Sequence, residues 1–385
     1  MTRWIGVALA GWLAAGLVGL AAYVYGYDAH RGFGAAHTPA GVPRGQLRVI
    51  AFRSPAIHRT DRYLVYLPPG YAPDAARGER FPVFYFLHGA PGKMTSLTDV
   101  DAAQVTADEL IARHEIRPLL LVAPAAVQGL YGDTEWANSP SGRWMDEVVA
   151  IVHDVDRRFA TLPRRRDRAI AGDSEGAYGA VNVALHHLGL FSVVESWSGY
   201  FWQTRSTVFA HAPAAQIAAN SPAAELRTRG REIRRLGLRA WIYQGRQDRS
   251  DPAQTVHFAA DLRRAGAQVR FRFFPGGHDW ALWRRETPRM LTAASRWFAT
   301  PARGAPRRAT GRSAAASRGA RRGRPSRARH GRSRPRSAAR AASSPAGSRD
   351  ASGAAPPHRR TATTRRRRSS SPPGRRRGRA PGRSA

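Results

Sequence analysis

The sequence predicts an α/β fold built on a mostly parallel sheet, and two observations support this prediction. Short apolar runs alternate with segments of helical periodicity from residue 46 to residue 300. In addition, residues 81–87 read FPVFYFL, a continuous apolar run that is typical of a strand buried on both faces of a parallel sheet. Strands that alternate with helices in this way form β-α-β units, whose strands lie parallel.

The predicted elements follow in order along residues 46–300. Apolar, β-branched and aromatic runs predict strands at residues 47–52, 63–67, 81–87, 119–122, 168–171, 192–197, 238–243 and 269–274. Apolar residues at helical spacing predict helices at residues 101–114, 144–159, 175–187, 253–265 and 280–299. Pro288 is compatible with the last of these only if the helix breaks or kinks near Thr287. The pattern weakens between residues 199 and 236, where we expect an insertion of loops and short helices.

The net charge of +35 is concentrated at the C-terminal end of the chain. Residues 301–385 contain 26 Arg and one acidic residue, Asp350, and so carry +25, which leaves +10 for residues 1–300. This segment has almost no large apolar residues and cannot bury enough surface to fold, so we predict a disordered Arg-rich tail over residues 301–385. Three interpretations of the tail remain open: contact with an anionic polymer or lipid, an inert extension, or translation of GC-rich DNA in the wrong frame.

The first 27 residues contain an uncharged stretch from Trp4 to Tyr27, which is long enough to cross a bilayer. We predict a signal anchor, an N-terminal transmembrane helix that leaves the rest of the chain extracytoplasmic; the alternative is a cleaved signal peptide and a secreted protein. Residues 28–45, rich in Gly, Ala and Pro, are predicted to form a linker. The chain has no cysteine, which excludes disulfides, thiolate metal sites and a cysteine nucleophile.

Residues 169–180, AIAGDSEGAYGA, contain the motif G-x-S-x-G centred on Ser174. An apolar strand enters the motif and a helical pattern of small residues leaves it, which is the strand-turn-helix context of a nucleophilic serine. Glycine is required at positions 172 and 176, because the sharp turn brings neighbouring backbone too close for side chains there. An ordinary Gly-Ser turn is the alternative, since five such residues also arise by chance.

A serine hydroxyl needs a base to take its proton, and the order Ser, Asp, His along the chain selects the partners of Ser174. His278 follows the last predicted strand, where catalytic loop residues gather in open α/β sheets, and we predict that it is the base. Asp248 follows the preceding strand through a glycine turn and is the predicted orienting carboxylate. Asp251 is its competitor, although its place before Pro252 also suits the N-cap of the next helix.

Acyl transfer also requires donors for the developing oxyanion, and we predict the backbone N–H groups of Ala90 and Glu175 for this role. His88 is then expected to be a structural loop residue. The chain contains no H-E-x-x-H or P-loop pattern, so we predict neither a metal nor a nucleotide cofactor.

Five segments of the chain carry a resemblance to a known family: GDSEGAYGA, FLHGAPG, YLPPGY, QGRQD and GGHDWALW. Together they resemble the esterase family of α/β-hydrolases that includes feruloyl esterases, enterochelin esterases, S-formylglutathione hydrolase and the secreted mycolyltransferases. The resemblance spans about residues 46–299. It implies the α/β-hydrolase fold, with Ser174 as nucleophile, Asp248 as acid, His278 as base, and Ala90 and Glu175 at the oxyanion hole.

Two positions depart from this family pattern. Ala177 stands where many members have a second glycine, which is a mild change. Glu175 stands where many relatives carry methionine, leucine or another apolar residue, and we expect its side chain to alter the entrance of the pocket.

These observations predict a serine esterase that hydrolyses a carboxylic ester of a small molecule or a glycolipid through an acyl-enzyme. The first alternative is an acyltransferase of the mycolyltransferase type, in which a sugar or glycolipid hydroxyl replaces water. The second is a non-catalytic protein that keeps the fold and binds the envelope or nucleic acid through its basic tail. The intact Ser, Asp and His set argues against the second alternative.

Overall fold

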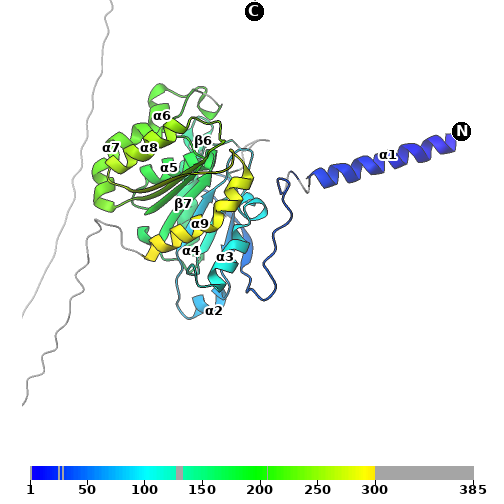
Figure 1. Cartoon of the computed structure of the whole chain (residues 1–385), viewed down its shortest axis with the longest axis horizontal. Coiled ribbons are helices and arrows are strands. Elements are labelled where there is room, and N and C mark those ends of the chain that lie inside the picture. The colour runs from blue at the N-terminus through cyan, green and yellow to red at the C-terminus, as the bar shows by residue number, and fades with distance from the viewer. Residues whose placement is uncertain (1, 25–26, 28–29, 127–132, 206, 300–385) are drawn as a thin grey trace, which may run out of the picture. The chain divides into compact units, whose positions relative to one another are not determined.

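The computed structural model describes residues 2–24, 27, 30–126, 133–205 and 207–299. The tail at residues 301–385, which the sequence predicts to be disordered, lies outside the described residues. Within them, strands and helices alternate along the chain as the sequence predicts (Figure 1).

A mixed, mostly parallel sheet of eight strands forms the centre of the domain, in the order β1-β2-β4-β3-β7-β8-β9-β10. β2 runs antiparallel to β1 and to β4, and every other neighbouring pair is parallel. The predicted α/β class with a mostly parallel sheet is therefore confirmed. The strands are β1 (Gln46–Arg53), β2 (Thr60–Leu67), β3 (Val83–Leu87), β4 (Leu120–Pro124), β7 (Arg168–Asp173), β8 (Val193–Trp197), β9 (Arg239–Gly245) and β10 (Gln268–Phe274); β5 (Asn138–Ser139) and β6 (Gly142–Arg143) form a separate hairpin.

Helices cover both faces of the sheet, and β3 shows why its sequence is apolar throughout (Figure 1). Tyr85 of β3 packs into the core beneath α4, α5, α7 and α8, whereas Phe84 and Phe86 pack on the opposite face beneath α3 and α9. Each residue of this strand therefore meets a hydrophobic core. The helices of the domain are α2 (Tyr71–Ala76), α3 (Ala103–Ala112), α4 (Trp144–Arg158), α5 (Glu175–His186), α6 (Ala214–Ala219), α7 (Pro222–Leu236), α8 (Pro252–Arg264) and α9 (Trp280–Ala299).

The weakly patterned region between residues 199 and 236 contains α6 and α7. α6 is short, as expected, but α7 is a helix of 15 residues. Only Pro222, Leu226 and Ile233 of α7 are buried, and arginines occupy much of the rest of the helix. This narrow apolar stripe explains why the helical pattern is weak in the sequence.

The N-terminal segment forms α1 (Thr2–Tyr23), at the position of the predicted transmembrane helix. Exposed side chains of this helix include those of Trp12, Leu13 and Val18. Of the helices in the described ranges, none combines the length and the apolarity that are needed to cross a membrane.

Residues 30–45, most of the predicted linker, pack against the domain through the buried Asp108 of α3. The Thr38 hydroxyl donates to one oxygen of this carboxylate at 2.7 Å, and the Gly45 N–H donates to the other at 2.8 Å. The Tyr66 hydroxyl of β2 donates to that second oxygen at 2.6 Å. Asp108 therefore ties the N-terminal segment to the sheet and to α3.

Candidate active site

Ser174 lies in the sharp turn between β7 and α5, and its backbone angles are φ 52° and ψ −117°. A positive φ is strained for a serine. A Cβ added to Gly172 would lie 2.3 Å from the carbonyl carbon of Gly176, and one added to Gly176 would lie 1.9 Å from the carbonyl oxygen of Leu87. Neither contact is possible, so both glycines of the motif are required by the turn.

The structure brings Ser174, His278 and Asp248 together, although they lie far apart in the sequence. The hydroxyl of Ser174 lies 2.7 Å from Nε2 of His278, and Nδ1 of His278 lies 2.9 Å from a carboxylate oxygen of Asp248. The side chain of His278 is 35% exposed, whereas that of Asp248 is 1% exposed. This is the geometry of a nucleophile, a base that solvent and substrate can reach, and a shielded orienting carboxylate.

Asp248 and its competitor Asp251 have different partners. Asp248 follows β9, contacts His278 and also accepts from the Ser250 N–H at 2.8 Å. Asp251 is the N-cap of α8 and accepts from the Ala253 N–H at 2.8 Å. Burial alone would raise the pKa of Asp248, but the hydrogen bonds from Ser250 and His278 lower it below its usual value. Asp248 is therefore an ionised partner for the imidazole.

The loop after β3 contains the predicted oxyanion donor Ala90, and it lies against the serine turn. A Cβ added to Gly89 would lie 3.0 Å from the Cβ of Ser174, so the two backbones are in close contact. His88 is buried, with ring nitrogens 3.0 Å from the carbonyl oxygens of Gly89 and Ala125. Burial lowers the pKa of this imidazole. His88 therefore shapes the loop, as the sequence predicts.

Sequence reasoning missed the parts that the side chains of Asp173 and Glu175 play beside the serine. Asp173 is fully buried and accepts from the Gly89 N–H at 3.1 Å. Glu175 does not reach the pocket entrance as expected: its carboxyl is buried and accepts from the Thr134 N–H at 3.1 Å and the Glu135 N–H at 2.7 Å. The available signal was two acidic residues inside a run of small and apolar ones.

A second missed feature is the N-terminal segment, which contacts the loop after β3 and the start of α9 through Arg31. The guanidinium of Arg31 donates to the Pro91 carbonyl at 3.0 Å, and it lies over the Trp280 ring at 5.9 Å from the ring centroid. Pro91 follows the predicted oxyanion donor, and Trp280 follows His278 by two residues. Arg31 therefore bridges the loop after β3 and the first residue of α9, which follows the loop that carries the histidine.

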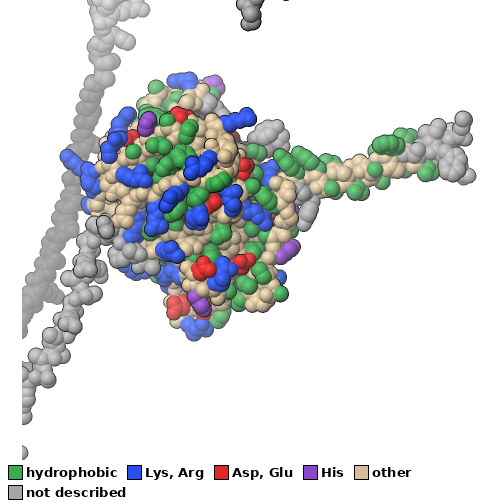
Figure 2. Space-filling model, in the orientation of Figure 1, with side chains coloured by type: hydrophobic (Ala, Val, Ile, Leu, Met, Phe, Trp, Pro, Cys, Tyr) green, Lys and Arg blue, Asp and Glu red, His purple; other side chains and the backbone are tan. Residues whose placement is uncertain are grey.

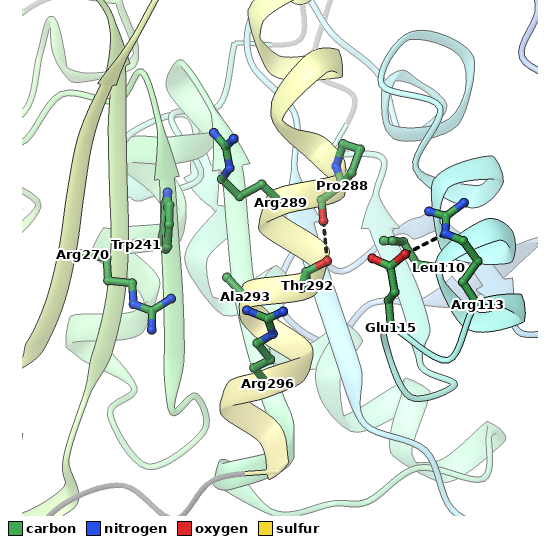
Figure 3. Close-up of a pocket in the computed structure, with 10 residues that line it drawn as sticks. All are labelled: Leu110, Arg113, Glu115, Trp241, Arg270, Pro288, Arg289, Thr292, Ala293 and Arg296. Atoms are coloured by element: carbon green, nitrogen blue, oxygen red, sulfur yellow. Dashed lines mark hydrogen bonds and ion pairs between the residues drawn. The ribbon is translucent and has the colours of Figure 1, made fainter.

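A surface hollow of about 390 Å³ is bordered by α3, β9, β10 and α9. Figure 3 shows the residues that line it. Arg113 pairs with Glu115 beside it, and Arg270 lies over the ring of Trp241. None of the predicted site residues lines this hollow, so it is not part of the candidate active site. Figure 2 shows Lys and Arg side chains across the visible face of the domain, with fewer acidic ones among them, in keeping with its basic charge.

The domain is similar to known proteins in sequence and in fold. The Esterase family, described as "Putative esterase", matches residues 54–294. A curated endo-1,4-beta-xylanase/feruloyl esterase of Xylanibacter ruminicola is 27% identical over 157 residues, which cover 39% of this chain and 21% of that protein. The matched stretch is thus about a fifth of the curated relative.

Solved structures show the same fold. A ferulic acid esterase superposes with a TM-score of 0.59 at 21% identity, over 66% of this chain and 99% of the other. FphF, a fluorophosphonate-binding serine hydrolase of Staphylococcus aureus, gives a TM-score of 0.57 at 20% identity over the same shares. The S-formylglutathione hydrolase of that organism gives 0.55 at 19% identity, again over 66% and 99%. The domain has the α/β-hydrolase fold.

Proposed function

The chain belongs to the Esterase family, and from that premise we propose that it hydrolyses a carboxylic ester through an acyl-enzyme formed on Ser174. The hydrogen-bonded series from Ser174 through His278 to Asp248 is the observation that carries the proposal. A serine hydroxyl is a weak nucleophile until an adjacent base takes its proton, and His278 stands at the required distance.

In the proposed reaction, the Ser174 oxygen attacks the ester carbonyl carbon while Nε2 of His278 takes the hydroxyl proton. Asp248 accepts from Nδ1–H, which fixes the tautomer and stabilises the imidazolium. The oxyanion forms beside the backbone N–H groups of Ala90 and Glu175. His278 then gives its proton to the departing alcohol, and a water molecule activated by the same imidazole releases the acid and restores Ser174.

We propose esters of aromatic acids, such as ferulate esters, as the first substrates to test. The support comes from similar proteins, because similar structures include ferulic acid esterases and a curated relative carries a feruloyl esterase name. S-Formylglutathione hydrolase is also among the similar structures, so a thioester belongs in the same panel.

Labelling with a fluorophosphonate tests the proposed function, because this reagent phosphonylates an activated serine. We expect the wild-type protein to be labelled and to hydrolyse a small chromogenic ester, and Ser174→Ala to do neither. Ser141→Ala, which changes a half-buried serine of the β5–β6 hairpin, is the matched control and should behave as the wild type. An unlabelled wild type, or label that persists in Ser174→Ala, would contradict the proposal.

We also propose that the N-terminal segment directs the domain out of the cytoplasm. The uncharged stretch from Trp4 to Tyr27 and the exposed apolar side chains of α1 support this localisation. Cell fractionation with mass measurement of the mature protein tests it, and we expect the domain in an extracytoplasmic fraction. Recovery of the full chain in the cytoplasm alone would overturn it.

A further inference from the structure

Both chain neighbours of Ser174 are acidic and buried, and each carboxyl reaches a different loop beside the serine. We propose that Asp173 and Glu175 are positioning residues, which hold the loop after β3 and the loop at residues 134–136 against the nucleophile and so set the oxyanion site. This inference rests on the proposed function, because it assumes that an oxyanion forms next to Ser174.

Asp173 acts directly on the loop after β3. Its carboxyl accepts from the Gly89 N–H at 3.1 Å, and its own exposure is 0%. A Cβ on Gly89 would lie 3.1 Å from the second carboxyl oxygen of Asp173 and 3.0 Å from the Cβ of Ser174. Gly89 is therefore packed on the serine turn and tied to it by one hydrogen bond. Because Ala90 is the next residue, the position of its N–H depends on this contact.

Glu175 acts on the same loop through a second route. One of its carboxyl oxygens accepts from both the Thr134 and the Glu135 N–H groups, which fixes the backbone just before Trp136. The indole N–H of Trp136 donates to the His88 carbonyl at 2.9 Å, and the ring is fully buried. The two carboxyls therefore converge on the segment from His88 to Ala90, Asp173 from the serine turn and Glu175 through Trp136.

The packing around the two carboxyls favours an uncharged acceptor at each position. Burial raises the pKa of Asp173 to about 7, and it raises the pKa of Glu175 well above its usual value. Asp101, Arg284 and Tyr243 are the ionisable neighbours on the side of Asp173. Glu135, Asp133, Tyr178 and Tyr200 are those on the side of Glu175.

An amide side chain reproduces the neutral acceptor, whereas alanine removes it. Asp173→Asn and Glu175→Gln keep a carbonyl oxygen where the loop N–H groups donate. Asp173→Ala and Glu175→Ala leave those N–H groups without a partner and free the loop to shift. The four variants therefore separate the loss of the hydrogen bond from the loss of the acid itself.

The experiment measures kcat and KM for an ester that the wild type hydrolyses, together with the affinity for a trifluoromethyl ketone. This inhibitor forms an oxyanion on the serine, whereas the carboxylic acid product does not. We expect each alanine variant to lose about 10- to 100-fold in kcat and in ketone affinity, with KM and product affinity nearly unchanged. The amide variants should stay within about threefold of the wild type.

Glu195→Ala is the matched control for the loss of a buried carboxyl. Glu195 lies in β8, is fully buried and accepts a hydrogen bond from the indole N–H of Trp197 rather than from a loop N–H. Its substitution should lower the melting temperature and leave the ketone affinity of the folded protein unchanged. This control distinguishes a general loss of stability from a displaced oxyanion site.

Trp136→Phe tests the Glu175 route without removing a carboxyl, and it covers the case in which an alanine variant fails to fold. It keeps an aromatic ring but removes the donor to the His88 carbonyl, and it should show the same selective loss of kcat and ketone affinity. Wild-type values in the folded alanine variants or in Trp136→Phe would overturn the inference, as would equal losses in amide and alanine variants. A wild type that hydrolyses no ester would instead contradict the proposed function.

Discussion

Two aspartates that lie three residues apart, Asp248 and Asp251, show how different neighbours give one residue type different roles. We expect Asp248→Asn to lower kcat by about 10³- to 10⁴-fold, because an amide cannot stabilise the imidazolium of His278 or hold its required tautomer. Asp251→Ala should leave kcat within about twofold and cost about 1 kcal/mol of stability through loss of the α8 cap. Steady-state kinetics and thermal unfolding measure both effects. A large loss of kcat in Asp251→Ala would reassign the orienting carboxylate.

The glycines of the serine turn give a second prediction at this scale. In Gly176→Ala the new Cβ would lie 1.9 Å from the Leu87 carbonyl oxygen, which belongs to a central strand and cannot move aside. We expect at least about 3 kcal/mol of destabilisation, or no folded protein. Gly189→Ala is the control, since no atom lies within 4 Å of its added Cβ, and it should change stability by less than about 1 kcal/mol. Denaturant unfolding of both variants checks this, and a stable, folded Gly176→Ala would contradict it.

The residues that sequence reasoning placed and those that it missed differ in a physical respect. The grouping of Ser174, Asp248 and His278, which follow β7, β9 and β10, could be predicted because a serine hydrolase would need these residue types at the carboxyl ends of sheet strands. The contacts of Asp173 and Glu175 could not, because their partners lie 84 and 41 residues away and depend on how the loops pack. Until those loops are placed, a carboxyl beside the serine is indistinguishable from one that faces solvent.

At the scale of elements, the central strands β3, β4, β7, β8 and β9 were predictable because their apolar runs are buried on both faces. Helix α7 was not, because it buries only a narrow stripe. α9 continues from Trp280 to Ala299 although Pro288 lies inside it. Pro288 lies on the exposed side of the helix beside the hollow in Figure 3, and Thr292 donates to its carbonyl at 2.8 Å. The strong packing of α9 on the sheet outweighs the local cost of the proline.

Because a proline is unfavourable inside a helix, we expect the replacement of Pro288 to stabilise the domain. Pro288→Ala supplies a backbone N–H to the preceding helical turn and removes the steric conflict of the ring, which we expect to raise the free energy of unfolding by about 1–3 kcal/mol. Pro252→Ala, at the first turn of α8, is the control, because proline is favourable at that position and its loss should not stabilise. Chemical denaturation compares them. If Pro288→Ala is no more stable than Pro252→Ala, α9 is already relaxed around its proline.

At the scale of the whole molecule, burial raises the pKa values of carboxyls in separate parts of the domain. Burial raises the pKa of Asp173, Glu135 and Glu147 to about 7 in each case. Glu147 lies on α4, outside the serine turn, and its carboxylate accepts a hydrogen bond from the Ser54 hydroxyl. In the unfolded chain these groups regain their ordinary lower pKa values, so the folded state binds more protons than the unfolded state between about pH 4.5 and pH 7.

The additional protons bound by the folded state make the domain more stable in mild acid. Because the folded state holds the additional protons, the free energy of unfolding falls as the pH rises through that window and levels off above about pH 7. We therefore expect a higher melting temperature at pH 5 than at pH 8 at constant ionic strength. Glu147→Gln, which removes one of the three groups without touching the candidate site, should flatten this dependence. A melting temperature that is constant or rises from pH 5 to pH 8 would refute the prediction.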